Sequence, residues 1–168
     1  TFFCLGRNVD KFGDIYNQIL EAGHSVGNHS YSHLKGFRSS VSRYMDDIDL
    51  AGDLIDSRLF HPPYGRILPG QVRAVLEQYE IIMWDVLSID YNTRLDGDRV
   101  LQNVIKNVQP GSIIVFHDSD NSGTVRLDGA VWANELAERL SAEGLDVVVI
   151  EVDPQGNKVY ATADRSAD

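Results

Sequence analysis

The sequence predicts an α/β fold in which helices cover a sheet of parallel strands. Short apolar segments typical of buried strands alternate with longer segments whose apolar residues recur at helical spacing. The 168 residues are enough for one domain with a real core, and a composition of 43% hydrophobic and 24% charged residues is ordinary for such a domain. We therefore treat residues 1–168 as a single domain, built either as an open doubly wound sheet or as a barrel.

The predicted strands are apolar runs, several of them rich in aromatic or β-branched residues. We expect strands at 1–5, 25–28, 59–61, 80–86, 112–117 and 145–152, all parallel in one sheet. Between them, helical spacing begins at Phe12, after a cap at Ser39 or Ser40, at Pro69, at Val100 and at Val131. The aspartates between 46 and 56 are assigned to the solvated face of the second of these helices, and residues 158–162 to a hairpin arm.

The net charge of the chain limits the classes of partner that it can bind. A formal net charge of −10 argues against binding to nucleic acid or to anionic membranes, because both need a basic surface. No apolar run approaches membrane-spanning length. A neutral polymer such as a polysaccharide is compatible with this charge. The chain carries no signal peptide and begins inside a predicted strand, from which we expect a fragment or a processed chain.

Two histidines four residues apart, His29 and His33, follow the second predicted strand. That spacing places both imidazoles on one face of a helical turn, where they can reach one ion. Neutral imidazole is a common ligand of divalent transition metals. The alternative is a pair of surface histidines beside a turn.

Further polar residues follow the other strands. His61 comes after the third strand, Asp85 and Asp90 after the fourth, and His117 after the fifth. Because the carboxyl ends of parallel strands share one rim, these side chains are expected to converge with the histidine pair.

These blocks resemble the polysaccharide deacetylases, metal-dependent carbohydrate esterases that remove N- or O-acetyl groups from chitin, peptidoglycan, xylan and similar polymers. The segment His29–His33 matches the family's His-(Ser/Thr)-x-x-His motif, and His61-Pro62-Pro63-Tyr64-Gly65 resembles its Arg-Pro-Pro-Tyr-Gly block. Residues 84–91 resemble the block that usually ends in Asp-Trp, and Val115-Phe116-His117 resembles the Leu-x-His block. The similarity runs in order from residue 1 to about 120.

The resemblance implies a distorted, incomplete (β/α) barrel and a set of roles. His29 and His33 would bind a divalent metal, with Zn²⁺ as the first candidate. His117 would protonate the leaving group with Asp90, or failing that Asp85, beside its ring. The remaining candidate residues come from the same blocks: His61 in the catalytic group, and Pro63, Tyr64, Tyr91 and Val115 for substrate, with the Tyr64 N–H as oxyanion donor. It also suggests an extracytoplasmic protein.

The chain departs from the family pattern in three places. The family's Thr-Phe-Asp-Asp block, which supplies the general base and the third metal ligand, is absent together with its strand and helix. The segment that ends at Asp164 resembles this block faintly and could take its place only in a permuted chain. His61 replaces an arginine that braces the catalytic aspartate, and Leu87 stands where the family often has Asp.

These departures lower the expected activity. The 168 residues alone are expected to be at least about a hundredfold less active than a chain carrying that block. Apolar surface beside Phe2 and Phe3 is expected to favour self-association through the N-terminal edge. The alternative function is that of a catalytically inactive or truncated relative that binds glycans. An unrelated α/β protein fits the ordered blocks least well.

Overall fold

The computed structural model describes residues 1–92, 94–117 and 148–153. Within them, a 7-stranded sheet has the order β4-β3-β2-β1-β7-β6-β5. Its strands are Phe2–Cys4 (β1), Val26–Asn28 (β2), Leu59–Phe60 (β3), Glu80–Ile81 (β4), Val86–Leu87 (β5), Ile113–His117 (β6) and Val148–Asp153 (β7). Every pairing between neighbouring strands is parallel, which confirms the predicted strand direction.

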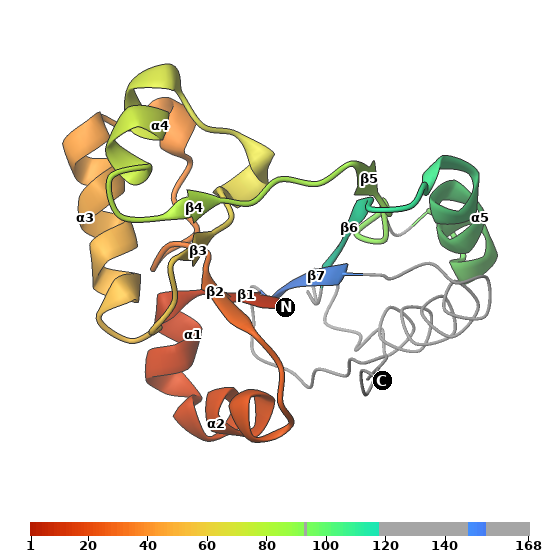
Figure 1. Cartoon of the computed structure of the whole chain (residues 1–168), viewed down its shortest axis with the longest axis horizontal. Helices are drawn as coiled ribbons and strands as arrows, with labels where there is room; N and C mark the ends of the chain where they lie inside the picture. Colours follow the sequence, from red (N-terminus) through yellow and green to blue (C-terminus); the bar gives the residue numbers. More distant parts are fainter. Residues whose placement is uncertain (93, 118–147, 154–168) are drawn as a thin grey trace.

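The strand order is that of a barrel. Each strand but one lies beside the strand that follows it in the sequence, and the last strand, β7, pairs with β1. A doubly wound sheet would instead reverse its order at a switch point. The ring is open only between β4 and β5, where residues 82–85 cross from one edge of the sheet to the other (Figure 1). The molecule is therefore an incomplete (β/α) barrel.

The strand predicted at 80–86 is wrong as a single strand. Its two ends belong to opposite edges of the sheet, because the Ile82 N–H still donates to the Phe60 carbonyl while the Asp85 N–H donates to that of Ile113. Periodicity does not reveal this, since both ends are apolar and extended.

The N-terminal strand is not an edge. β1 pairs with β2 on one side and with β7 on the other, and Phe2 and Phe3 are only 3% and 1% exposed. The prediction of exposed apolar surface beside these two residues is therefore wrong. The reason for predicting self-association through this edge is thereby removed.

Four of the five helices described begin near predicted residues, whereas the first, α1, was not predicted. They are α1 (Gly6–Lys11), α2 (Gly13–Glu21), α3 (Val41–Gly52), α4 (Pro69–Val75) and α5 (Gly97–Asn107), with short 3₁₀ turns η1 (Gly36–Arg38) and η2 (Pro63–Gly65). The Ser40 hydroxyl accepts from the Arg43 N–H and so caps α3. No helix in the described ranges has the length and apolar character needed to cross a bilayer. The helix predicted from Val131 and the arm at 158–162 lie outside the described residues.

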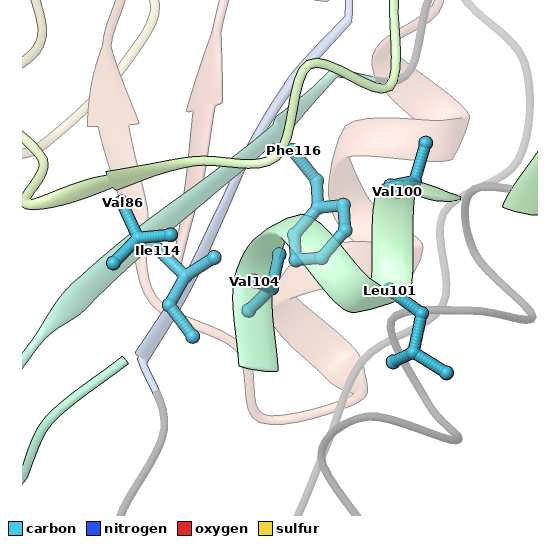
Figure 2. Packing of buried hydrophobic residues seen from close by; sticks show 6 residues of the cluster. All are labelled: Val86, Val100, Leu101, Val104, Ile114 and Phe116. Carbon is cyan, nitrogen blue, oxygen red and sulfur yellow. The ribbon is translucent and has the colours of Figure 1, made fainter. Parts of the chain in front are cut away.

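Alternation along the strands separates two packing regions. Phe3 and Val115 are buried together in a cluster that also contains Leu59, Leu87 and Ile113. On the other side of the same strands, β5 and β6 pack against α5, as Figure 2 shows for Val86, Ile114, Phe116, Val100, Leu101 and Val104. His61 lies two residues after Leu59, and His117 two after Val115, so both continue the Phe3 side toward the carboxyl rim.

Candidate active site

The two motif histidines lie on an irregular loop directly after β2. The predicted helical turn is wrong: residues 29–33 are not helical, and Ser30 and His33 have positive φ angles of 65° and 60°. Asn28 causes the turn, because its Oδ1 accepts from the Ser30 N–H at 2.7 Å. The loop nevertheless brings the rings of His29 and His33 together, with 5.0 Å between their centroids.

Asp47 of α3 fastens this loop. Its carboxylate accepts from the Ser32 N–H at 3.1 Å and from the Ser32 hydroxyl at 2.7 Å, while its backbone carbonyl accepts from the Tyr31 N–H. The assignment of Asp47 to a merely solvated face is therefore wrong. No local pattern signals it, because its partner lies 15 residues away in the sequence.

His29 is held in the form that binds metal. Its Nδ1 lies 2.7 Å from the His61 carbonyl oxygen, which can only accept, so Nδ1 carries the proton and Nε2 keeps a free lone pair. Burial, reinforced by the nearby His61 and His33, lowers the His29 pKa well below its usual range. Burial and the charge of Arg7 lower the pKa of His33 to about 4. Both imidazoles are therefore neutral at neutral pH.

His61 lies beneath this pair and is only 3% exposed. Its Nδ1 donates to the Ile82 carbonyl at 2.7 Å, and its ring stacks on His29 at 5.2 Å with an interplanar angle of 9°. Burial lowers its pKa to about 4. A neutral ring in this position does not replace the bracing charge of an arginine, and it packs on His29 instead of facing a carboxylate.

The donor set fits a divalent ion only in part. His29 and His33 offer two neutral nitrogens, and a backbone carbonyl fixes the tautomer of His29 in the way that supports metal ligands. Within the described ranges, no group of three or more His, Cys, Asp or Glu side chains is arranged to hold a metal. The hydroxyl of Ser30, next to His29, is buried with no hydrogen-bond partner in this part of the chain.

Asp90 and His117 form a pair on the opposite half of the rim. The Asp90 Oδ1 lies 2.9 Å from the His117 Nδ1, and Oδ2 accepts from the His117 N–H at 2.6 Å. Asp90 also accepts from the Ser88 hydroxyl and the Tyr91 N–H. Its side chain is 7% exposed and that of His117 27%. The predicted contact between these two residues is confirmed.

Asp85 does not join this pair. Its carboxylate accepts from the Ile113 N–H at 2.8 Å, at the amino end of β6, whereas His117 is at the carboxyl end of that strand. The structure thus gives Asp85 a place at the base of the barrel, away from the rim. A residue that the sequence did not suggest, Asn103 of α5, instead holds the loop before Asp90 by donating to the Leu87 and Ser88 carbonyls.

The predicted substrate residues divide into rim and core. Tyr64 is 49% exposed, has a positive φ of 61° and places its ring 4.6 Å from that of His33. Tyr91 is 48% exposed and meets the His117 ring edge-on at 5.1 Å. Pro63 is buried in η2. Val115 is fully buried against Phe3, so direct contact with a substrate does not fit its position.

Electrostatic coupling joins the two halves of the rim. A charge on His117 lowers the pKa of His33, His61 and His29, so the four imidazoles act on one another across the mouth of the barrel. The arrangement therefore brings two neutral imidazoles and a carboxylate-held imidazole to one rim.

The sequence matches a known protein family. Residues 1–84 match the family model of polysaccharide deacetylases. A peptidoglycan-N-acetylglucosamine deacetylase of Bacillus cereus is 31% identical over 158 residues, covering 89% of this chain and 56% of that protein. The chain thus spans little more than half the length of this relative.

Solved structures share the fold. The crystal structure of a peptidoglycan N-acetylglucosamine deacetylase in complex with an N-oxidanyl-benzamide has a TM-score of 0.75 and 30% identity, covering 88% of this chain and 71% of that one. A CE4 family pseudoenzyme from Bacillus anthracis has a TM-score of 0.72 and 26% identity, covering 92% of this chain and 53% of its own. This chain belongs to the polysaccharide deacetylase family.

Proposed function

We propose that this chain serves in the metal-dependent hydrolysis of acetyl groups on a polysaccharide. The observation that carries the proposal is the pairing of two kinds of imidazole at one rim. His29 and His33 are neutral and buried or half-buried, and His117 is hydrogen-bonded to a carboxylate. Family membership and the similarity to peptidoglycan deacetylases support it.

His29 and His33 would hold a divalent ion, for which zinc is the first candidate because imidazole nitrogens suit it. Such an ion, when bound, polarises an acetyl carbonyl and lowers the pKa of a bound water. Its remaining ligands would come from water, substrate or residues other than those described.

His117 would transfer the proton to the leaving group. Because Asp90 accepts at Nδ1, the Nε2 atom is the one free to deliver a proton. The Tyr64 N–H follows Pro63 at the rim and would donate to the developing oxyanion. Tyr91, edge-on to His117, would wall the acetyl pocket.

The bond proposed for cleavage is the amide of an N-acetylated sugar, as in peptidoglycan or chitin. The peptidoglycan-N-acetylglucosamine deacetylase of Bacillus cereus supports this choice. An O-acetyl ester, as in xylan, would use the same residues. A cell-wall polymer as substrate would place the protein outside the cytoplasm.

A glycan-binding role without catalysis is the second candidate. It is favoured by the likeness to the pseudoenzyme, by His61 in place of arginine and by the lack of a third metal ligand among the described residues. Such a protein would keep the rim aromatics Tyr64 and Tyr91 but not release acetate.

The test is acetate release from N-acetylated chito-oligosaccharide, with and without a chelator. Catalysis predicts that chelation abolishes release and that His117→Ala lowers the rate about a hundredfold. His24→Gln is the matched control, because His24 packs on Phe2 away from the rim. Binding of the oligosaccharide with no acetate release by the unmodified chain would instead establish the second candidate.

A further inference from the structure

A cluster of aromatic and cationic side chains extends from the histidine pair along the rim. Tyr64, whose ring lies 4.6 Å from His33, meets Phe37 at 6.1 Å in a T-shaped contact. Lys35 Nζ lies 5.5 Å from the Tyr64 centroid. The guanidinium groups of Arg66 and Arg38 lie 5.4 and 6.0 Å from the centroid of Phe37. We call these five residues the aromatic–cationic platform.

The three cations of the platform have no carboxylate partner among the residues that the structure describes. Within the part of the chain that the structure describes, no Asp or Glu oxygen lies within 4.0 Å of Lys35, Arg38 or Arg66. All three are exposed. The chain carries 25 acidic residues against 15 Lys and Arg, so three unpaired cations on one short stretch of rim oppose its overall charge. An exposed cation on an aromatic face also keeps its outward N–H donors available.

The backbone segments that carry the platform are fixed by hydrogen bonds and close packing. Gln71 is fully buried and donates to the Gly36 and Ser39 carbonyls, which fixes η1 on α4. Gly36 packs so tightly on Tyr44 that a Cβ there would lie 2.7 Å from its ring. Arg66 follows η2, whose turn is closed by the Gly65 N–H and the Pro62 carbonyl. A prepositioned surface spends little conformational entropy on binding.

We propose that this platform binds a carboxylate-bearing residue of the glycan, next to the sugar whose acetyl group lies at His29 and His33. The inference rests on the proposed function for the position of the acetyl group. The faces of Phe37 and Tyr64 supply apolar contact for sugar rings, and the three cations supply donors for an anionic substituent. Neutral chitin or xylan offers these cations no partner, whereas peptidoglycan, with its lactyl and peptide carboxylates, does.

The test measures binding, so it does not depend on acetate release. The full chain is sedimented with insoluble peptidoglycan freed of teichoic-acid phosphate by hydrofluoric acid, and with the same material after amidation of its carboxyls. The triple variant Lys35→Gln, Arg38→Gln, Arg66→Gln is expected to bind the untreated carboxyl material about tenfold more weakly than the unmodified chain. The difference should vanish on amidated material.

Lys11→Gln provides the control, since Lys11 makes the same kind of contact, 4.7 Å from the Phe12 centroid, on a different element. It should bind like the unmodified chain. Raising NaCl from about 0.05 M to about 0.5 M should weaken binding of the unmodified chain, a readout that does not require any variant to fold. The same change should leave the triple variant almost unaffected. Equal binding to carboxyl and amidated material by the unmodified chain, or insensitivity to salt, would overturn the proposal. If binding behaves as expected but no acetate is released from any polymer, the proposed catalysis fails and the platform stands.

Discussion

The two halves of the rim hold their imidazoles by different acceptors. In the half formed by β2, β3 and β4, His29 and His61 donate to backbone carbonyls and are buried. In the half formed by β5 and β6, His117 donates to the Asp90 carboxylate and is partly exposed. A neutral acceptor in a dry site favours the neutral ring. The carbonyl-held imidazoles of His29 and His61 are therefore neutral at neutral pH, whereas the imidazole held by a carboxylate is partly exposed.

The largest effect on stability is expected where residues 82–85, which join the two halves of the rim, pack against Gly65. Gly65 has a φ of +59°, and a Cβ at this position would lie 1.6 Å from the Trp84 ring, which stands in the crossing segment and packs on His61. Gly65→Ala combines backbone strain with overpacking and is expected to cost about 4 kcal/mol of unfolding free energy, measured by urea denaturation. Gly13→Ala, where no atom lies within 4 Å, should be neutral or slightly stabilising. A stable Gly65→Ala protein would show that the halves are not fixed by this contact.

The buried histidines in the half of the rim formed by β2, β3 and β4 should make the stability of the folded chain sensitive to acid. The pKa of His61 is about 4 in the folded chain, and an unfolded histidine titrates near 6.5. Stability is therefore unaffected above pH 6.5, falls as pH drops from about 6.5 to 4 because only the unfolded chain takes up the proton, and levels off below. The expected loss from His61 is about 3 kcal/mol, and His29 and His33 act in the same direction.

This prediction is checked by urea midpoints at about pH 7.5 and about pH 4.5, in chelator. His61→Gln should flatten the dependence more than His24→Gln does, because burial lowers the pKa of His24 by less. If the urea midpoints of the unmodified chain and of His61→Gln changed with pH in the same way, burial of His61 would not be the cause of the acid sensitivity.

In the half of the rim formed by β5 and β6, Asp90 lies at the rim and Asp85 at the base of the barrel, so substitutions at the two positions should have different effects. Asp90→Asn removes the charge beside His117 and is expected to lower acetate release about a hundredfold, which corresponds to about 2.7 kcal/mol in the barrier. Asp85→Asn keeps an oxygen that can accept from the Ile113 N–H and removes only a charge at the amino end of β6, so it should cost at most about 1 kcal/mol of stability and leave the rate unchanged. If the two variants affected the rate equally, the position of Asp85 at the base would not separate it from the chemistry.

The smallest effect concerns the support of the histidine loop. Asp47→Ala deletes the acceptor for both Ser32 groups and should cost about 1 kcal/mol of stability, because these bonds are exposed. It should also weaken zinc binding more than Asp46→Ala does, which removes a neighbouring carboxylate without bonds to the loop. Equal zinc affinities in a competition titration would mean that the loop keeps its shape without Asp47.

The sequence alone located most of the rim because the relevant signals are local. In a parallel α/β chain each strand ends at the same rim, so polar residues directly after apolar runs, such as His29 and His117, are expected to meet. The contact of His117 with Asp90 followed from the same rule together with the family resemblance.

What could not be predicted depends on long-range geometry. The four-residue spacing of His29 and His33 suggested a helical turn, but the positive φ angles of Ser30 and His33 come from bonds to Asn28 and to α3 that periodicity does not record. The division of the 80–86 segment between two sheet edges, and with it the place of Asp85, likewise depends on which carbonyls lie nearby in space.

The opening between β4 and β5 has a consequence for how this chain meets its neighbours in a crowded solution. An open sheet normally exposes a row of unpaired backbone groups onto which a foreign strand can grow, the first step of many aggregates. Here both edge strands are only two residues long. Edges this short offer an incoming strand only a few backbone groups in register, so the opening of the ring is a poor template for strand addition.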